Sequence, residues 1–379
     1  MMLLVYGAGQ LAQMMYLAAT PLGIDVQAVD VASENVVNPI SKQLITSDLA
    51  SAISRADAIT VEFEHVPEHL LVDASNSGKL YPNIDSILAG ADRVREKTLL
   101  QKNGIANCQH EIITDVAQLS GITSRLGSKL IFKASRDGYD GYGQWRLSNE
   151  SQLSELAAAF AKLDLQKVPL IAEAMLAFDR EISIVGARDK HGKICCFPIA
   201  ENLHHKGQLH VSIAPATDIS EALQRKANEI FKQLATAMDY VGVLAVELFQ
   251  CGDELLVNEI APRVHNSGHW TQQGATTSQF EQHVRAVFGL PLGATNAVGV
   301  SAMVNIIGCE NINRNLMGID DCHLHWYGKV VRKKRKMGHI NMVAQSHSAL
   351  GGKLKQLTGY LPMEYFPKLI DEAERLSRK

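Results

Sequence analysis

The sequence predicts an α/β protein with three domains. Strands alternate with helices over residues 1–90, which is typical of a parallel sheet. Between Val168 and Pro215 the strands are longer and richer in β-branched residues, which indicates an antiparallel sheet. Short strands return after Pro291. A chain of 379 residues allows two or three domains at about 100–200 residues each.

The composition excludes several classes of protein. Hydrophobic residues make up 46% of the chain and charged residues 20%, so a mainly disordered chain is excluded. A net charge of −3 disfavours a general nucleic-acid binder. The first lysine is Lys42, and no segment approaches the roughly 18 apolar residues of a membrane helix. The six cysteines form no CxxC pair, so we expect buried, reduced thiols in a soluble cytoplasmic protein.

The N-terminal elements surround a glycine-rich turn. We expect a buried strand over Met2–Tyr6, a tight turn at Gly7–Gly9, a helix over Gln10–Ala19, and strands at Val26–Asp30 and Ala58–Val61. The turn matches the GxGxxA pattern, and Asp30 ends the second strand about twenty residues later. Taken alone, this pattern favours an NAD(P)-dependent oxidoreductase, which we keep as the alternative function. Any Rossmann-like domain, however, needs small residues where the strand meets the helix.

A second glycine-rich segment lies in the middle of the chain, between helices expected at 93–103 and 150–163. Gly138, Gly141 and Gly143 follow a strand expected over Leu130–Lys133. A glycine backbone can approach phosphate oxygens closely, and Lys133 would add positive charge. We therefore expect a loop that closes over a nucleotide, with a plain hairpin turn as the alternative.

Two apolar segments, 243–249 and 255–260, predict a hairpin with its turn near Asp253. This register places Glu247 opposite Glu259 on the same face. Like charges paired across strands are destabilising unless a cation lies between them. The pair therefore indicates a Mg²⁺ site, with a solvated pair on an outer face as the alternative.

The segment after this hairpin, residues 261–271, is rich in polar side chains. It contains an arginine, two histidines, an asparagine and a serine, which predicts a substrate-binding loop. The HxxxH spacing of His265 and His269 does not favour zinc, because Asn266 and Gly268 disfavour a regular helix.

The C-terminal part contains the only strong charge run, Arg332–Lys336, with Lys329 just before it. A short basic loop in an acidic protein is better suited to one phosphate monoester than to a polyanion. A solvated face and a nucleic-acid patch are the alternatives. We expect strands at Met303–Ile307 and His323–Tyr327, and a last helix over Pro367–Lys379.

Six segments together resemble the 5-(carboxyamino)imidazole ribonucleotide synthases of purine biosynthesis. They lie in the family's order and span nearly the whole chain, and the APRVHNSGHWT block is the most specific. The segments are Gly7–Leu11, Thr60–Val66, Gly138–Gln144, Asn258–Thr271, His323–Lys329 and Arg335–His339.

This resemblance implies an ATP-grasp architecture. We expect a Rossmann-like domain over residues 1–92, a two-lobed ATP-grasp domain over 93–292 and a small β-rich domain over 293–379. The implied reaction converts ATP, bicarbonate and 5-aminoimidazole ribonucleotide into the N-carboxylated ribonucleotide, ADP and phosphate, through carboxyphosphate. The resemblance also implies a cytoplasmic homodimer that uses Mg²⁺ and small-molecule substrates, with no nucleic acid and no membrane.

The resemblance further implies the roles of individual residues. For ATP they are Arg93, Lys133, Gly138, Tyr139, Asp140, Gly141, Tyr142, Gly143, Gln144, Glu173, Ala174, Met175, Leu176, Glu181, His204, Asn258 and Glu259. Mg²⁺ would be held by Glu247 and Glu259, and the catalytic residues would be Tyr139, Asp140, Arg263 and His265, the last two near bicarbonate. The ribonucleotide would contact Gly9, Gln10, Leu11, Glu62, Glu64, Asn266, Ser267, His269, Lys329, Arg335 and Lys336. The glycine loop departs from the family pattern, because Asp137 replaces a glycine and Tyr142 replaces a basic residue.

Overall fold

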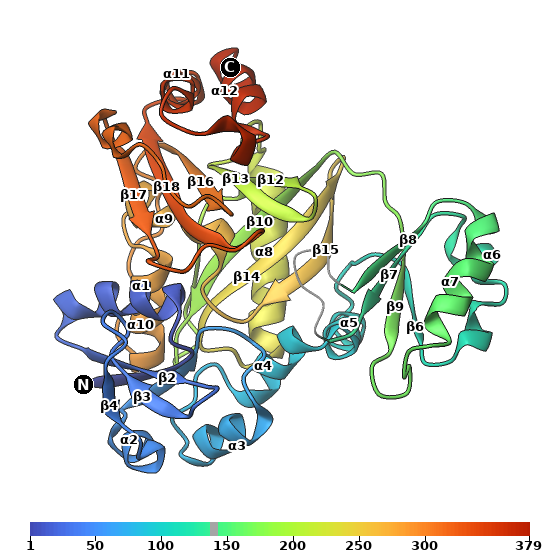
Figure 1. The fold of residues 1–379 in the computed structure, drawn as a ribbon, viewed down its shortest axis with the longest axis horizontal. Coiled ribbons are helices and arrows are strands. Elements are labelled where there is room, and N and C mark those ends of the chain that lie inside the picture. The colour runs from blue at the N-terminus through green and yellow to red at the C-terminus, as the bar shows by residue number, and fades with distance from the viewer. Residues whose placement is uncertain (137–142) are drawn as a thin grey trace.

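The computed structural model describes residues 1–136 and 143–379. Its N-terminal part is a five-stranded sheet in the order β4-β3-β2-β1-β5 (Figure 1). The strands are β1 (Met2–Tyr6), β2 (Asp25–Asp30), β3 (Asn35–Val37), β4 (Leu44–Thr46) and β5 (Ala58–Val61). The helices are α1 (Gln10–Ala19), α2 (Leu49–Arg55), α3 (Glu68–Asn76) and α4 (Ile84–Ala91).

The prediction of a purely parallel sheet is wrong at one edge. β1 pairs in parallel with β2 and β5, as expected, but β3 and β4 are antiparallel. These two strands have three residues each, and no crossover helix separates them from β2. A strand this short carries too little alternation to be recognised in the sequence.

The middle of the chain forms a small lobe that projects at the right of Figure 1. Its antiparallel sheet has the order β6-β9-β7-β8, with α6 (Ile122–Leu126) and α7 (Leu153–Phe160) packed on it. The strands are β6 (His110–Ile113), β7 (Leu130–Ala134), β8 (Gln144–Leu147) and β9 (Leu170–Ala174). The helix expected over 150–163 is shorter, because Glu150–Gln152 form a 3₁₀ turn and α7 ends at Phe160.

A nine-stranded sheet forms the centre of the molecule, in the order β15-β14-β10-β12-β13-β16-β18-β17, with β11 beside β10. Its first strands are β10 (Arg180–Arg188), β11 (Ile194–Cys196), β12 (Ala200–His205), β13 (Gln208–Ala214), β14 (Gly242–Cys251) and β15 (Glu254–Ala261). Side chains alternate along β14: Leu244 and Val246 pack in the cluster under α8 (Glu221–Ala237), whereas Val243 and Ala245 pack in the cluster under α10 (Gln279–Phe288). The two helices therefore cover opposite faces of the sheet.

The C-terminal strands extend this same sheet, because β16 pairs with β13. They are β16 (Val300–Ile307), β17 (Cys322–Trp326) and β18 (Lys336–Ala344), which include the strands expected after Pro291. Two helices, α11 (His347–Thr358) and α12 (Leu369–Ser377), pack against each other at the top of Figure 1. The predicted last helix is therefore confirmed.

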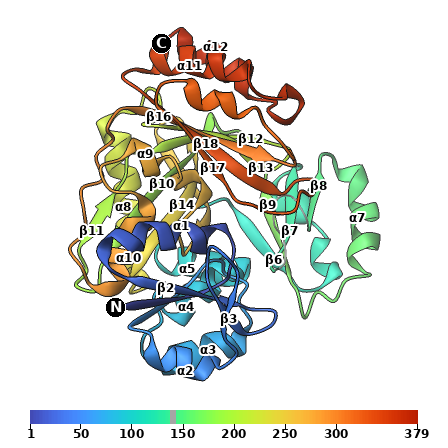
Figure 2. The ribbon, with the colours of Figure 1, turned by 60° about the vertical axis from the view of Figure 1, so that its left-hand side comes forward.

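Buried contacts connect the N-terminal sheet to the central one. Helix α1 lies against α10, as both views show (Figures 1 and 2). Thr60 Oγ1 lies 2.8 Å from His283 Nε2, and the N–H of Val243 donates to His283 Nδ1 at 3.1 Å. These contacts hold the end of β5 at a fixed distance from the start of β14.

Two sequence-based expectations concern the character of the whole chain. Across the described residues, none of the helices combines the length and the apolar character that a membrane span requires. All six cysteines are free thiols, as expected. Cys195, Cys196 and Cys251 are only half-buried, however, so the expectation of buried thiols is wrong for these three.

Candidate active site

The predicted hairpin is present as β14 and β15, and Glu247 is the partner of Glu259 across it. A β-bulge follows this pair, because Leu248 pairs with Val257 and Asn258 is left out of the register. A bulge can redirect a side chain that regular alternation would place on the other face. The buried Oδ1 of Asn258 has no hydrogen-bond partner, so it is an oxygen that remains available to a ligand.

This hairpin carries unbalanced negative charge. Burial first, and then the charge of Glu259, raise the pKa of Glu247 to about 7. Glu259 is 43% exposed, and its Oε2 lies 3.6 Å from Arg93 Nη2. Two facing carboxylates and an unpartnered amide oxygen suit a hard cation such as Mg²⁺. No cluster of three or more His, Cys, Asp or Glu side chains is placed to hold a metal within residues 1–136 and 143–379.

A buried ion triad lies beside the hairpin, where β7 pairs with β9. Glu173 accepts contacts from Lys133 Nζ at 2.6 Å and from Lys97 Nζ at 2.7 Å. Burial alone would raise the pKa of Glu173, but the charges of the two lysines outweigh burial and lower it to about 2. Lys97 is 1% exposed and also donates to the carbonyl of Asn258 at 3.3 Å. Lys97 was not predicted as a site residue, because a lysine in a helix has no distinctive signal before its partner is known.

The remaining residues implied for ATP lie on the strand ends around this triad. Ala174, Met175 and Leu176 lead from the small lobe toward β10, and the side chain of Met175 is 39% exposed. Glu181 on β10 lies 3.1 Å from His204 on β12 (Oε2 to Nδ1). Burial would lower the pKa of His204, but the hydrogen bond to Glu181 and the charge of Glu247 outweigh burial and raise it.

The predicted glycine loop lies mostly outside the described residues. Gly138, Tyr139, Asp140, Gly141 and Tyr142 belong to that segment. Gly143 follows it with a φ of +64°, and its carbonyl accepts from the N–H of Ala134 at 2.8 Å. Gln144 begins β8 and pairs with Lys133 on β7. The described end of this segment, Gly143 and Gln144, therefore lies beside β7, with Gln144 opposite Lys133.

A pocket of about 370 Å³ brings three distant segments of the chain together. It includes nine of the side chains and backbone positions that the sequence assigned to substrate or catalysis, together with Ala8, Phe63 and Tyr327. The nine are Gly9, Gln10, Leu11, Glu62, Arg263, His265, Asn266, His269 and Lys336.

The N-terminal wall of this pocket is built around Glu62. Its carboxylate accepts from the N–H of Gly9 at 2.5 Å and from the N–H of Leu11 at 2.9 Å, at the first turn of α1. A Cβ at Gly9 would lie 2.4 Å from Glu62 Oε1, so the glycine is needed for this close approach. A dinucleotide pyrophosphate would need the same N–H groups. The geometry thus gives the GxGxxA turn a role other than NAD(P) binding.

The loop after β15 supplies the second wall. Arg263 Nε lies 2.8 Å from Glu64 Oε1, so both acidic residues of the N-terminal segment already have partners. Neither amide atom of Asn266 has a hydrogen-bond partner, although both are buried. His269 Nδ1 lies 2.9 Å from Gln279 Nε2, and burial keeps the pKa of His269 well below its usual value. Asn266 is therefore the side chain here with hydrogen-bonding capacity to offer a ligand.

His265 connects this loop to the acidic hairpin. Its Nε2 lies 3.8 Å from Glu247 Oε1, and its Nδ1 lies 2.9 Å from Ser267 Oγ. Burial holds the pKa of His265 well below its usual value, and the charge of Arg263 adds to this effect. Ser267 is fully buried and does not line the pocket.

The basic segment, Lys329–Lys336, follows β17, leads into β18 and supplies the third wall of the pocket. Lys336 lines the pocket, whereas Lys329 and Arg335 lie just beyond its lining. Lys329 Nζ lies 5.6 Å from the ring centre of Tyr327, and Arg335 Nη1 donates to the carbonyl of Val330 at 3.0 Å. Burial first, and then the charge of Arg335, lower the pKa of Lys329 to about 8.

Tyr327 is a second residue that the sequence analysis missed. Its OH lies 2.7 Å from His339 Nδ1, and His339 Nε2 lies 2.8 Å from Gln272 Oε1. His339 also stacks on His325 with ring centres 4.4 Å apart. An aromatic residue at a strand end is normally interpreted as part of a core, so its local pattern did not distinguish it as a site residue.

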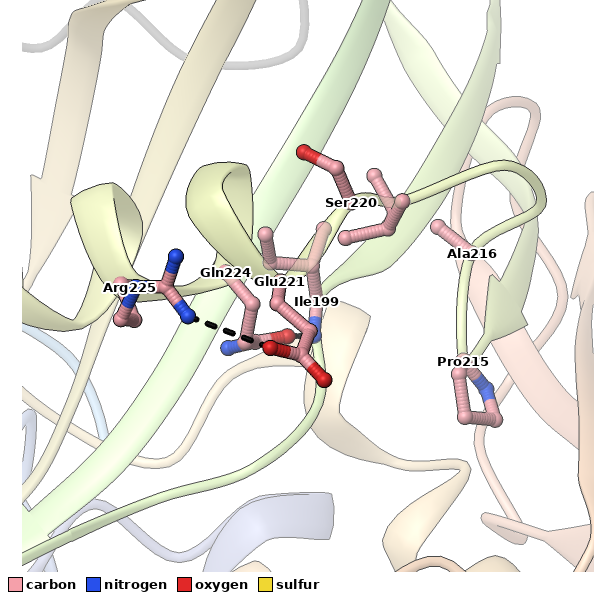
Figure 3. A pocket seen from close by; sticks show the side chains of 8 residues that line it. Ile199, Pro215, Ala216, Ser220, Glu221, Gln224 and Arg225 are labelled. Atoms are coloured by element: carbon pink, nitrogen blue, oxygen red, sulfur yellow. Dashed lines mark hydrogen bonds and ion pairs between the residues drawn. The ribbon is translucent and has the colours of Figure 1, made fainter.

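Another pocket, of about 440 Å³, lies at the start of α8 and contains none of the predicted site residues (Figure 3). Its polar groups pair among themselves: Arg225 lies 3.3 Å from Glu221, and Gln224 accepts from the N–H of Ile199 at 3.0 Å. Apolar side chains such as Ile219 and Pro215 form the rest of it. This pocket therefore does not gather groups suited to catalysis.

Family models match three consecutive parts of the chain. A ribonucleotide synthetase pre-ATP-grasp domain matches residues 1–89, and an ATP-grasp domain matches residues 98–280. A phosphoribosylaminoimidazole carboxylase C-terminal domain matches residues 301–353. The α/β, ATP-grasp architecture expected from the sequence is thus confirmed.

Similar proteins cover essentially the whole chain. The N5-carboxyaminoimidazole ribonucleotide synthase of Vibrio cholerae is 47% identical over 99% of this chain and 100% of its own length. The crystal structure of the synthetase from Thermus thermophilus has a TM-score of 0.86 and 37% identity, covering 95% of this chain and 98% of that one. The Aspergillus clavatus synthase, in complex with ADP and 5-aminoimidazole ribonucleotide, has a TM-score of 0.80 and 27% identity, covering 99% of this chain and 98% of that one.

Proposed function

Because this chain belongs to the N5-carboxyaminoimidazole ribonucleotide synthase family, we propose that its acidic hairpin and its three-walled pocket are the two halves of one active site. The chain is an ATP-dependent carbon–nitrogen ligase. It carboxylates 5-aminoimidazole ribonucleotide and releases ADP and phosphate. The comparisons give no support to an oxidoreductase.

The observation that carries the arrangement of the two halves is the position of His265. This residue lines the pocket, and its Nε2 lies 3.8 Å from Glu247 Oε1 on the hairpin. A group bound beside His265 is therefore within reach of both the pocket and the hairpin. Bicarbonate must react first with ATP and then with the ribonucleotide. We therefore place bicarbonate beside His265.

On the hairpin side, we assign ATP to the residues where the small lobe meets the central sheet. These are the paired residues Lys133 and Glu173, Arg93 beside Glu259, and Glu181 beside His204. Glu247, Glu259 and the unpartnered Oδ1 of Asn258 would hold Mg²⁺. A Mg²⁺ ion bound there would neutralise phosphate charge, which is the main requirement of phosphoryl transfer. Lys133 would leave Glu173 for the phosphates, and Lys97 would stay to balance Glu173.

On the pocket side, we assign the ribonucleotide to the space between Glu62, Asn266 and Lys336, with its phosphate at the basic segment Lys329–Lys336.

The reaction begins when a bicarbonate oxygen takes the γ-phosphoryl group of ATP, which yields carboxyphosphate and ADP. The amine of the ribonucleotide then attacks the carboxyl carbon, directly or after release of CO₂, and phosphate leaves. Arg263 and His265 would donate hydrogen bonds to the carboxyl oxygens as charge develops.

Coupled measurement of ADP tests this proposal. We expect ADP release to require both bicarbonate and 5-aminoimidazole ribonucleotide, and to stop when Mg²⁺ is chelated. ADP release without the ribonucleotide, or undiminished release in excess chelator, would contradict the assignment. We also propose a cytoplasmic homodimer, which the family resemblance implies, and light scattering on the purified chain tests the dimer.

A further inference from the structure

A chain of hydrogen bonds runs from the central sheet to His265. It joins Ser212 Oγ to Asn202 Oδ1 at 2.7 Å, Asn202 Nδ2 to Ser183 Oγ at 3.0 Å, Ser183 Oγ to Ser267 Oγ at 2.9 Å, and Ser267 Oγ to His265 Nδ1 at 2.9 Å. All five residues are at most 9% exposed. Ser183, Asn202 and Ser212 belong to β10, β12 and β13, which are neighbours in the sheet.

The direction of every hydrogen bond in this chain is fixed by one backbone group. The N–H of Ser267 donates to His265 Nδ1 at 3.3 Å, so Nδ1 must offer a lone pair. The hydroxyl of Ser267, at 2.9 Å from the same atom, must then donate to it as well. Having used its own proton, Ser267 Oγ can only accept from Ser183.

The same logic orients the remaining members. Because Ser183 donates to Ser267, it accepts from the amide NH₂ group of Asn202. The carbonyl oxygen of that amide is left to accept from Ser212. If the Asn202 amide were reversed, Ser183 would donate to Asn202, and two oxygen lone pairs would face each other between Ser183 and Ser267. The observed distances therefore permit only one assignment of donor and acceptor along the chain of hydrogen bonds.

The consequence concerns the other nitrogen of the imidazole ring. With Nδ1 committed as an acceptor, the ring proton of His265 resides on Nε2. This atom is on the side of Glu247 Oε1, at 3.8 Å, and His265 lines the same pocket as Arg263 and Asn266.

We propose that Ser183 and Asn202 are positioning residues that lock His265 in its Nε2–H tautomer, so that it acts as a hydrogen-bond donor to the reacting carboxyl group and not as a base. The tautomer follows from the contacts alone. Its use in the reaction rests on the proposed function, which places bicarbonate beside His265.

Nuclear magnetic resonance of the full, ligand-free chain tests the tautomer. Histidine would be labelled with ¹⁵N, and the signals of His265 would be identified by their absence in His265→Gln. We expect long-range ¹H–¹⁵N correlations to show a protonated Nε2 and a bare Nδ1. A proton on Nδ1, whether alone or together with Nε2–H, would overturn the inference.

Substitution of Asn202 tests whether the chain sets this tautomer. Asn202→Asp is nearly isosteric, but a carboxylate only accepts, so it would take the proton of Ser183 away from Ser267. We expect a signal from Nδ1–H of His265 and about a tenfold loss of kcat, comparable to one lost hydrogen bond. The KM for ATP should change by less than about twofold. Ser212→Ala is the matched control, because it removes only the far end and leaves the links to His265 in place.

A second variant keeps the test decisive if Asn202→Asp does not fold. Ser183→Ala removes the donor to Ser267 and introduces no charge, so we expect a mixture of the two tautomers. An unchanged Nε2–H signal in every folded variant would show that the chain of hydrogen bonds does not set the tautomer of His265.

The role of His265 as a donor has its own test. His265→Gln retains an amide N–H, whereas His265→Leu retains no polar group. We expect His265→Gln to keep a kcat at least about tenfold higher than His265→Leu. Equal kcat values would contradict a donor role. The resonance experiments contain no substrate, so their outcome stands apart from a failure of the ligase assay.

Discussion

On the proposed nucleotide side of the active site, positive side chains are already paired with acids of the protein. Lys133 and Lys97 both contact Glu173, and Arg93 lies 3.6 Å from Glu259. On the proposed ribonucleotide side, burial lowers the pKa of Lys329 first, the charges of Arg335 and Lys336 also lower it, and only the charge of Glu62 opposes them. The basic segment thus carries repulsion that a bound phosphate would relieve.

This difference indicates how each half meets its ligand. In the proposed site, ATP would have to displace existing ion pairs. Part of its binding energy would therefore be used in exchanging partners. The ribonucleotide phosphate would replace the repulsion among the cations of the basic segment by attraction. Its charge should therefore dominate the affinity for the ribonucleotide.

The largest effect should come from the hairpin. Glu259→Gln removes one of the two facing carboxylates and should lower kcat on the order of 10²- to 10³-fold, as expected when charge stabilisation is lost. Stability of the ligand-free protein should stay equal or rise, because repulsion with Glu247 is relieved. Steady-state ADP release measures the change in kcat, and thermal unfolding measures the change in stability. Glu254→Gln, at the exposed end of the same hairpin, is the control. Near-normal activity of Glu259→Gln at limiting Mg²⁺ would refute the metal assignment.

The second effect concerns the stability of the ion triad. Lys97→Met leaves the buried Glu173 with one lysine instead of two, and we expect a loss of about 3 kcal/mol in the free energy of unfolding at pH 7. Lys102→Met, at the exposed end of the same helix, α5 (Arg93–Lys102), should lower the free energy of unfolding much less. Urea titrations provide the comparison.

The pH dependence of this loss has a definite sign. The folded-state pKa of Glu173 is lowered to about 2, so its stabilising contribution is complete above its ordinary pKa of about 4.5. That contribution decreases as the pH falls from about 4.5 toward 2. The difference between Lys97→Met and the wild type should therefore stay nearly constant from pH 7 to about pH 4.5 and shrink as the pH falls below that value. A constant difference would mean that the methionine acts through packing instead.

The third effect lies on the ribonucleotide side. Arg335→Ala should raise the KM for the ribonucleotide about ten- to a hundredfold, because it removes a charge-assisted contact worth about 1.5–3 kcal/mol. The KM for ATP should stay nearly constant. Lys333→Ala is the matched control, since Lys333 is exposed in the same loop. Equal increases for both variants would indicate a diffuse electrostatic effect and no defined phosphate site.

The sequence predicted those parts of the site that depend on local geometry. Gly252 and Asp253 fix the turn of the hairpin, and the register that follows pairs Glu247 with Glu259. The strand–turn–helix at the N-terminus was predicted equally well, since its period and its glycines are local signals. The family resemblance supplied the order of the other motifs.

What the sequence did not predict depends on distant partners. The bulge at Asn258 was not predicted, because it becomes visible only in the pairing of β14 with β15. The role of Gly9 became clear only once Glu62 was found against it. The pairing of β13 with β16 joins segments that α8, the hairpin and α10 separate, so the continuity of the large sheet could not be seen in advance. Lys97 and the chain from Ser212 to His265 are further examples, since serines and lysines acquire their roles only from contacts across strands.

The smallest effect is a pH dependence that separates the two sides within one enzyme. Lys329 has a pKa of about 8, below its ordinary value, because of burial first and then the charge of Arg335. Only its protonated form attracts phosphate, so kcat/KM for the ribonucleotide should fall about fivefold between pH 7 and pH 9, as one charged contact is lost. The kcat/KM for ATP should not share this decrease, because the nucleotide side has no such lysine in its proposed contacts.

Two variants show whether Lys329 is the titrating group. Lys329→Arg keeps its charge over this range, so its profile for the ribonucleotide should become flat. Arg335→Ala removes a neighbouring cation, so the pKa of Lys329 should rise and the decrease should move to higher pH. Bicarbonate titrates in the same way in all three proteins and is therefore cancelled by the comparison. If Lys329→Arg retains the wild-type decrease, the titrating group is elsewhere, and the repulsion within the basic segment does not govern how the ribonucleotide binds.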